Sequence, residues 1–372
     1  MMDLIRFEFY KIFKSKTVWS IMLLTFIGSL YLSTQMIGED LKPSLKKIGG
    51  VITEQKVKEA QKEDQKILEK SADSGVLSVE DENMRDAYDK LFYVGHYVKL
   101  HPIKISDALN EAKETNSEYE KNKFELKADM LQNIHYDRLD YQRPMEQAVL
   151  YMLTGSLSLV LIYIILNVSL TYTNEYTSGV ANYLLSSTNG RSKTLFAKLF
   201  AHWSVIALII LLSTFSAVLL WGVYDGFSGW NSPLQSIKKF YESPYPISIG
   251  QFIIVTALLQ MLIGIALSTL ILCISLISKS LLQSLALTLL IIVGPIAIST
   301  FIPLTFIPEK VLLAMNFIPS IGLNTAVLFR DFNTVNILGK PTLFPIVMIL
   351  LMVLLLVLTL IFSFKLIKIK KI

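Results

Sequence analysis

Cysteine is almost absent from this sequence of 372 residues, in which Cys273 is the single example and lies within an apolar run. One cysteine excludes an intrachain disulfide and a cysteine-based metal framework. We interpret Cys273 as a small buried apolar side chain. The sequence also lacks a G-x-x-x-x-G-K-[ST] phosphate-binding loop and an H-E-x-x-H metal-binding helix. The chain therefore carries neither the usual signal of an ATPase nor that of a zinc enzyme, and we predict no metal site.

Charge is missing from several long apolar runs, although Lys, Glu and Asp crowd the stretches between them. Hydrophobic residues make up 52% of the chain. A bilayer core about 30 Å thick is spanned by roughly 20 helical residues, and each run is that long. We predict an all-α polytopic membrane protein with six transmembrane helices. The expected spans are 17–37, 146–172, 198–224, 249–277, 281–306 and 343–364.

The central parts of these six spans contain no Asp, Glu, Lys, Arg or His. Ionisable side chains within a membrane commonly mark ion sites and proton relays. Their absence argues against a proton- or sodium-coupled transporter. It also removes the usual acids and bases of an intramembrane enzyme, and Gly155-Ser156 has no nearby His or Lys base. We predict no catalytic residue in this chain.

Basic residues near the span ends indicate the orientation. Lys and Arg are enriched in cytoplasmic loops, and an even number of spans places both termini on one side. This predicts cytoplasmic termini and a first span retained as a membrane anchor. The basic residues are not gathered into a stripe, so we expect no nucleic acid partner. The residues behind the orientation are Arg6, Lys11, Lys14, Lys16, Arg191, Lys193, Lys198, Lys279, Lys365, Lys368, Lys370 and Lys371.

The largest polar segment, 38–145, follows the first span and would form an extracellular helical domain. Within it, 51–70 and 105–134 are expected to be helices, joined through a linker at 73–81. The second helix repeats apolar residues at three-, four- and seven-residue steps, which is typical of one buried face. His96, His101 and His135 lie nearby without a metal-ligand spacing, and we interpret them as surface residues.

Residues 1–16 predict a cytoplasmic amphipathic helix lying in the membrane interface. Ile5, Phe9 and Phe13 alternate there with charged side chains. The alternative is a disordered basic tail.

Two features mark the second half of the chain. The apolar segment 307–329 is broken by proline and glycine, which favours a re-entrant or interfacial segment on the outer side over a seventh span. Gly294 and Pro295 lie inside the fifth span, where proline commonly kinks a helix. They are a possible hinge, or only part of the architecture.

The loop at 173–198 carries the most specific pattern in the sequence. Glu175-x3-Gly179-x4-Leu184-Leu185-Ser186 is followed by Gly190-Arg191 and by Lys198 at the start of the next span. This pattern resembles the first cytoplasmic loop of ABC-2 type permeases, the membrane-spanning subunits of bacterial ABC exporters. The layout of the spans in 146–372 and the amphipathic start resemble that family as well.

The resemblance implies a role for each residue of the pattern. Glu175 would be a polar contact at the surface of an ATPase subunit, and Gly179 the point of close approach. Leu184 and Leu185 would pack the coupling helix, while Arg191 would reach acidic groups or lipid phosphates. Simpler interpretations exist for two of them, because Glu175 could cap a helix and Arg191 could only mark the cytoplasmic side.

The sequence thus predicts a permease subunit in a bacterial cell membrane that moves a hydrophobic or amphipathic substrate outward, such as an antimicrobial peptide, a lipid or a drug. ATP and Mg would be bound by a separate cytoplasmic ABC ATPase, and this chain would bind no cofactor. A second permease subunit, identical or related, and membrane lipid are the other expected partners. The alternative is a membrane-anchored sensor or scaffold whose outer domain binds a peptide or lipid ligand.

Overall fold

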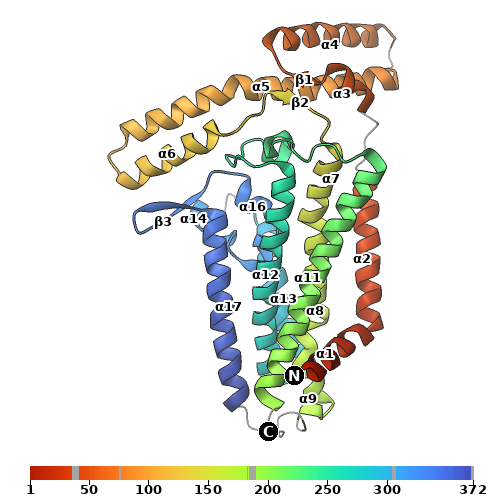
Figure 1. Ribbon diagram of the computed structural model, residues 1–372, viewed down its shortest axis with the longest axis vertical. Coiled ribbons are helices and arrows are strands. Elements are labelled where there is room, and N and C mark those ends of the chain that lie inside the picture. The colour runs from red at the N-terminus through yellow and green to blue at the C-terminus, as the bar shows by residue number, and fades with distance from the viewer. Residues whose placement is uncertain (36–41, 75–76, 182, 184–189, 304–306, 370–372) are drawn as a thin grey trace.

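A computed structural model gives the arrangement of the chain (Figure 1) and describes residues 1–35, 42–74, 77–181, 183, 190–303 and 307–369. Long helices run side by side in a bundle, and a further group of helices lies across one end of it. Met1 and Ile369 lie at the opposite end of the bundle from these crossing helices.

Five helical segments are long and apolar enough to cross a membrane. They confirm a polytopic helical membrane protein, and each begins and ends near a predicted span. The segments are Arg143–Thr177, Arg191–Asp225, Ile249–Ile277, Leu281–Phe301 and Phe344–Ile369.

The predicted first span corresponds to α2 (Lys16–Gln35), which packs along the helices that follow the polar segment 38–145. We call this segment the insertion. The apolar stretch of α2 among the described side chains, Val18–Gly28, is shorter than a full span. A sixth transmembrane helix therefore stays a prediction.

The segment Arg143–Thr177, which corresponds to the second predicted span, is not a uniform helix. It consists of α7 (Arg143–Tyr151), a π-helical turn (Met152–Ser156), α8 (Leu157–Leu166), a 3-10 turn (Val168–Leu170) and α9 (Thr171–Thr177). π-helical turns inside α-helices widen the helix locally and frequently lie at functional positions.

Two of the remaining helices of the bundle begin with a serine side-chain cap. In α12 (Ile249–Ile277) the Ser248 hydroxyl accepts from the Gln251 N–H, and the Gln251 side chain accepts from the Ser248 N–H. This reciprocal box satisfies two backbone donors that a helix start leaves open. The bundle also contains α11 (Gly190–Asp225), α13 (Leu281–Phe301) and α17 (Phe344–Ile369), and α1 (Met2–Lys14) lies at the end away from the crossing helices.

The insertion after α2 is largely helical, as expected, but its second predicted helix is wrong as a single element. The chain breaks at Thr115, whose backbone is extended, and Ser117 caps a new helix by accepting from the Glu120 N–H. The two resulting helices pack against each other. The elements of the insertion are α3 (Lys42–Ile48), β1 (Gly50–Val51), α4 (Glu54–Ser74), α5 (Val79–Glu114), α6 (Glu118–Gln132) and β2 (Arg138–Leu139).

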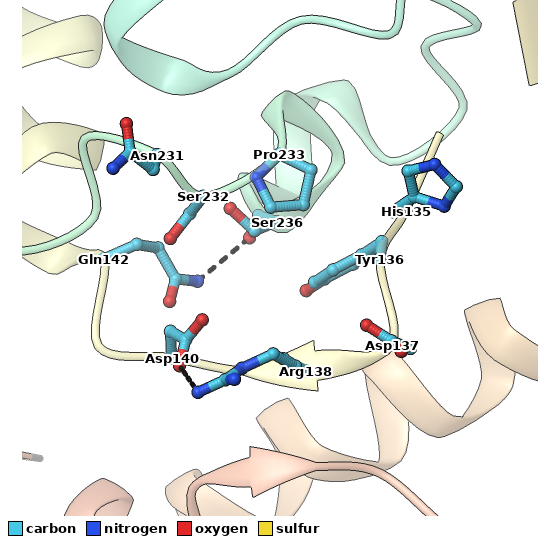
Figure 2. A pocket seen from close by; sticks show the side chains of 10 residues that line it. All are labelled: His135, Tyr136, Asp137, Arg138, Asp140, Gln142, Asn231, Ser232, Pro233 and Ser236. Atoms are coloured by element: carbon cyan, nitrogen blue, oxygen red, sulfur yellow. Dashed lines mark hydrogen bonds and ion pairs between the residues drawn. The ribbon is translucent and has the colours of Figure 1, made fainter. Parts of the chain in front are cut away.

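The insertion is tied to the end of the bundle. β1 pairs antiparallel with β2, which brings the two ends of the insertion together. Lys42 contacts Asp225 at the end of α11, and the Gln142 amide donates to the Ser236 carbonyl at 3.2 Å (Figure 2). The 3-10 turns Leu234–Ser236 and Lys238–Phe240 belong to the loop that this contact reaches.

The segment 307–329 forms three short helices, none long enough to span. They are α14 (Glu309–Met315), α15 (Pro319–Gly322) and α16 (Ala326–Phe329), followed by a hairpin of β3 (Thr334–Ile337) and β4 (Lys340–Leu343). α15 packs against α12 and α13. The Gln260 amide of α12 donates to the Leu323 carbonyl at 3.1 Å and to the Met152 carbonyl at 3.0 Å, so one side chain links this segment to the π-helical turn.

Candidate functional site: the ion cluster behind the coupling loop

The loop that carries the sequence pattern begins as α9, at the same end of the bundle as α1. Of the residues in the pattern, Glu175, Gly179 and Arg191 are described, whereas Leu184 and Leu185 lie outside the described residues. Nothing about the predicted packing of these two leucines is therefore tested.

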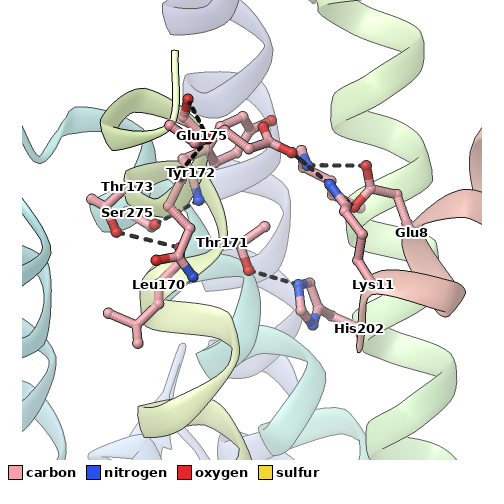
Figure 3. Close-up of polar contacts among 12 residues, drawn as sticks. Glu8, Lys11, Leu170, Thr171, Tyr172, Thr173, Glu175, His202 and Ser275 are labelled. Atoms are coloured by element: carbon pink, nitrogen blue, oxygen red, sulfur yellow. Dashed lines mark hydrogen bonds and ion pairs between the residues drawn. The ribbon is translucent and has the colours of Figure 1, made fainter. Parts of the chain in front are cut away.

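Glu175 lies inside the protein, with 7% of its surface exposed. Its Oε1 atom is 2.5 Å from Nζ of Lys198 and 2.5 Å from Nζ of Lys11 (Figure 3). Glu8 completes the group, since its Oε1 is 3.0 Å from Lys198 and its Oε2 is 2.8 Å from Lys11. We call Glu8, Lys11, Glu175 and Lys198 the ion cluster; it joins α1, α9 and α11.

The electrostatics of the ion cluster are balanced. Two carboxylates face two ammonium groups, and the Lys198 side chain is entirely buried. Removing charges from water costs several kcal/mol for each ion, and only close, well-placed partners offset that cost. For Lys11, burial disfavours the charged form, but the negative charges of Glu8 and Glu175 more than compensate and raise its pKa. Lys11 is thus held charged at neutral pH.

Further polar contacts fix α9 to the helices around it. The Tyr172 ring lies under the Lys198 ammonium, 5.3 Å from its centroid, and the Tyr172 N–H donates to Ser275 Oγ of α12 at 3.1 Å. Thr171 Oγ1 is 2.9 Å from Nε2 of His202, whose Nδ1 is 2.7 Å from the Tyr163 hydroxyl. These contacts connect α9 to α8, α11 and α12, so a force on α9 reaches three helices of the bundle.

Gly179 ends α9. Its φ of +72° lies in the left-handed region that favours glycine, and its N–H donates to the Tyr176 carbonyl at 3.2 Å. A Cβ placed there would meet nothing within 4 Å. Glycine is therefore suited to this turn by its backbone conformation, and its close approach to an ATPase stays a prediction.

Arg191 stands at the start of α11. Its Nη1 donates to the Lys368 carbonyl at the end of α17, at 2.7 Å. This contact ties the exit of the loop to the last helix. The predicted contact of Arg191 with acidic groups or lipid phosphates is not tested.

One face of the amphipathic helix α1 packs against the rest of the protein, and the other face is exposed. Glu8 and Ile12 are buried, Ile5 and Phe9 are half-buried, and Phe13 is 50% exposed. Two more aromatic residues, Phe7 and Tyr10, are exposed beside it. Phe13 stacks on Trp19 of α2 with centroids 5.2 Å apart. The protein-facing side of α1 thus carries part of the predicted apolar set, and Phe7, Tyr10 and Phe13 form an apolar surface that stays exposed. The position of α1 in a membrane interface stays a prediction.

Gly294 and Pro295 lie within α13, as expected from the sequence. A Cβ on Gly294 would have open space around it. Their role as a hinge stays a prediction.

Sequence reasoning missed the ion cluster as a unit. It used Lys11 as a marker of the cytoplasmic side and Lys198 as such a marker and as part of the loop pattern, and it did not pair either lysine with Glu8 or Glu175. A signal was present, because Glu8 stands three residues after Ile5 and four before Ile12, on the helical face that these apolar residues share. An acidic residue on an apolar face indicates a buried cationic partner, although it does not say which one.

Among the described residues there is no group of three or more His, Cys, Asp or Glu side chains placed to hold a metal ion.

Comparison with known proteins agrees with this arrangement. The family model described as "ABC-2 family transporter protein" matches residues 15–363, nearly the whole chain. No curated protein and no solved structure matches the chain significantly. The match covers the loop, the insertion, and the Glu175 and Lys198 side of the ion cluster, whereas α1 with Glu8 and Lys11 precedes it. The chain therefore belongs to the ABC-2 family of transporter proteins.

Proposed function

We propose that this protein is the permease subunit of an ATP-driven exporter and that a cytoplasmic ABC ATPase drives it through α9. Membership of the ABC-2 family supports an ATPase partner. The sequence has no phosphate-binding loop of its own, so ATP and Mg would be bound on that partner and no cofactor by this chain.

The ion cluster is the observation that supports this mechanism best. Closure of the ATPase pair would push on the loop at 173–198, and α9 would move with it. Because Glu175 is paired with Lys11 of α1 and with Lys198 of α11, the push would reach α1 and α11 together. Rigid helices joined by buried ion pairs transmit such a displacement as a rigid-body motion.

The proposed substrate is hydrophobic or amphipathic, such as a peptide, a lipid or a drug, and it would move outward. Support comes from the apolar centres of the spans, which lack ionisable side chains. A second permease, identical or related, would complete the translocation path. We place the complex in a bacterial cell membrane with both termini in the cytoplasm.

Co-purification from the native host tests the partnership. The tagged chain should retain a nucleotide-binding subunit and show ATPase activity, and the substitution Leu185→Asp in the loop should remove both. A tagged chain that purifies without any ATPase would contradict the proposal and would favour the sensor or scaffold instead.

A second experiment distinguishes transmission through the ion cluster from a direct Glu175 contact with the ATPase. Glu175→Gln, on the loop, and Lys11→Gln, outside it, should both uncouple ATP hydrolysis from transport while the ATPase stays bound. The double variant should be no worse than either single one, because residues of one network are not additive. If only Glu175→Gln has an effect and it releases the ATPase, Glu175 acts as a direct contact.

A further inference from the structure

The hairpin of β3 and β4 turns through a leucine in an unusual backbone conformation. Leu338 and Gly339 connect the two strands with φ values of +52° and +83°. The Gly339 N–H donates to Oδ1 of Asn336 at 2.9 Å. Positive φ at both central residues is typical of tight hairpin turns, which favour asparagine or aspartate followed by glycine. A bulky side chain in this left-handed region is strained.

Leu338 makes little contact within the protein that could offset this strain. Its side chain is 98% exposed, the highest value for any large apolar side chain that the structure describes. It is also the one residue other than glycine with a positive φ in the described part of the chain. A strained conformation that no internal contact supports indicates a function. The leucine is therefore best explained by a contact outside this chain.

The position of the hairpin relative to α17 sets its depth in a bilayer. β4 runs into α17 without a linker, and the stretch 344–364 carries no charged side chain before Lys365. Because roughly 20 helical residues cross a bilayer core, Phe344 lies at one edge of the core and β4 lies at the depth of the lipid headgroups. Figure 1 shows the hairpin running sideways from the start of α17. Its tip therefore extends over the membrane surface beside the bundle, whichever way the protein is oriented.

The charges near the tip are complementary to a lipid surface. Residues 332–343 contain no acidic side chain, and their single charged residue is Lys340, which is exposed beside the turn. The nearest acidic residue in the sequence, Asp331, is paired with Arg330 at 2.8 Å. An apolar side chain next to a cation suits the boundary between acyl chains and phosphates, since a lysine can bury its stem and keep its ammonium group at the headgroups.

We propose that the β3–β4 hairpin is a membrane-contacting finger. Leu338 inserts among the headgroups and upper acyl chains of the leaflet beside α17, and Lys340 binds lipid phosphate. α6 of the insertion packs on β4, and the Tyr119 hydroxyl is 2.9 Å from Thr334 Oγ1. The finger thus fixes both the start of α17 and the insertion to one leaflet. The proposal requires a membrane protein, but neither the ATPase nor a particular direction across the membrane.

Fluorescence of a labelled cysteine at the tip tests the lipid contact. The full chain, with Cys273→Ser as background, receives Leu338→Cys, is labelled with the dye NBD and is placed in lipid nanodiscs. The nanodiscs contain phosphatidylcholine with a nitroxide near the headgroup end of an acyl chain. This nitroxide should quench the dye strongly, and the emission of the dye should shift to the blue.

Leu68→Cys in the same background is the matched control. Leu68 is an exposed leucine of α4, which Figure 1 shows at the far end of the molecule from α1. A dye at this position should keep its emission in the presence of the nitroxide lipid.

Lys340→Gln tests the phosphate contact in the same assay. It should reduce the quenching at position 338. The loss should be larger when phosphatidylglycerol replaces part of the phosphatidylcholine, because the attraction of a cation to a leaflet grows with the negative charge of that leaflet. Unchanged quenching in both lipid mixtures would overturn the phosphate contact.

Leu338→Asn shows whether the leucine serves the fold instead. Asparagine followed by glycine is a preferred sequence for this turn, so the Tm of the detergent-solubilised variant should equal or exceed the wild-type value. A lower Tm would mean that Leu338 stabilises the protein itself and would overturn the proposal. Equal quenching at positions 338 and 68 would also overturn it. Absent quenching, with a disulfide that links two copies through position 338, would identify a second chain as the partner in place of lipid.

Discussion

Lys198 combines complete burial with two close carboxylate partners. Its ammonium lies 2.5 Å from Glu175 and 3.0 Å from Glu8, and no part of its side chain is exposed. At such a position the two carboxylates stabilise the ammonium group of the lysine. The lysine in turn offsets the electrostatic repulsion between the two carboxylates.

Lys198→Met should therefore be strongly destabilising. The change leaves two buried carboxylates with Lys11 as their only cation, and breaking a buried pair in this way costs about 3–5 kcal/mol. Thermal unfolding of the detergent-solubilised chain should show a clear fall of Tm. Lys193→Met, at an exposed lysine on the same helix, is the control and should change Tm little. Equal Tm values for both variants would show that the ion cluster contributes nothing to stability.

His101 gives the outer insertion a pH dependence. Burial lowers its pKa below the ordinary 6.5, and the charges of Lys104 and His135 act in the same direction, against a hydrogen bond to the Leu131 backbone. The unfolded chain then binds a proton more readily than the folded one. Stability from this group is complete above pH 6.5 and declines as the pH falls toward the folded-state pKa.

The Tm of the wild type should accordingly fall more between pH 7.5 and about pH 5 than that of His101→Phe, which keeps a ring against Tyr97. Exposed His96 on the same helix provides the control variant His96→Phe. A His101→Phe protein with the wild-type pH profile would contradict the assignment.

At the scale of elements, the apolar spans were predictable because length and absence of charge suffice to identify them. Both ends of α12 and the start of α13 fall at predicted positions for this reason, whereas α13 ends at Phe301, before the predicted end at 306. The break at Thr115 was not predicted, because the apolar repeat continues across it and only the capping serine interrupts it. The π-helical turn leaves no mark in an apolar run, and the ion cluster required the positions of three helices that are distant in sequence.

The π-helical turn contains a glycine with little space around it. A Cβ on Gly155 would lie 2.6 Å from Cε2 of Tyr151, whose side chain is fully buried. Gly155→Ala should overpack this turn and cost about 1–3 kcal/mol, seen as a lower Tm.

Gly294→Ala is the matched change in a helix with open space, and it should leave Tm unchanged or raise it, because alanine favours a helix over glycine by about 1 kcal/mol. If Gly294 is a hinge, the same variant transports more slowly. Full transport by Gly294→Ala would exclude the hinge, and an unchanged Tm for Gly155→Ala would show that Tyr151 moves aside.

At the scale of the whole molecule, the ion cluster and the insertion lie at opposite ends of the bundle. The proposed topology places the first in the cytoplasm and the second outside the cell. This direction across the membrane rests on the basic residues near the span ends.

Cysteine labelling in intact cells checks the direction. Cys273 is the single cysteine and is buried, so Cys273→Ser provides a background without cysteine. A cysteine in place of exposed Lys62 on the insertion should react with a membrane-impermeant maleimide in intact cells. One in place of exposed Lys193 should react only after the membrane is opened. The reverse pattern would invert the topology and remove the basis for ATPase docking at α9.

The pairing of β1 with β2 has a consequence for how the molecule could have been assembled. Gly50 stands opposite Leu139 and Val51 opposite Arg138, so the chain leaves and re-enters at neighbouring points. A segment with adjacent entry and exit can be lengthened, shortened or exchanged without altering the spacing of the helices on either side. Evolution could therefore graft a different recognition module onto this permease while the machinery at its far end stayed the same.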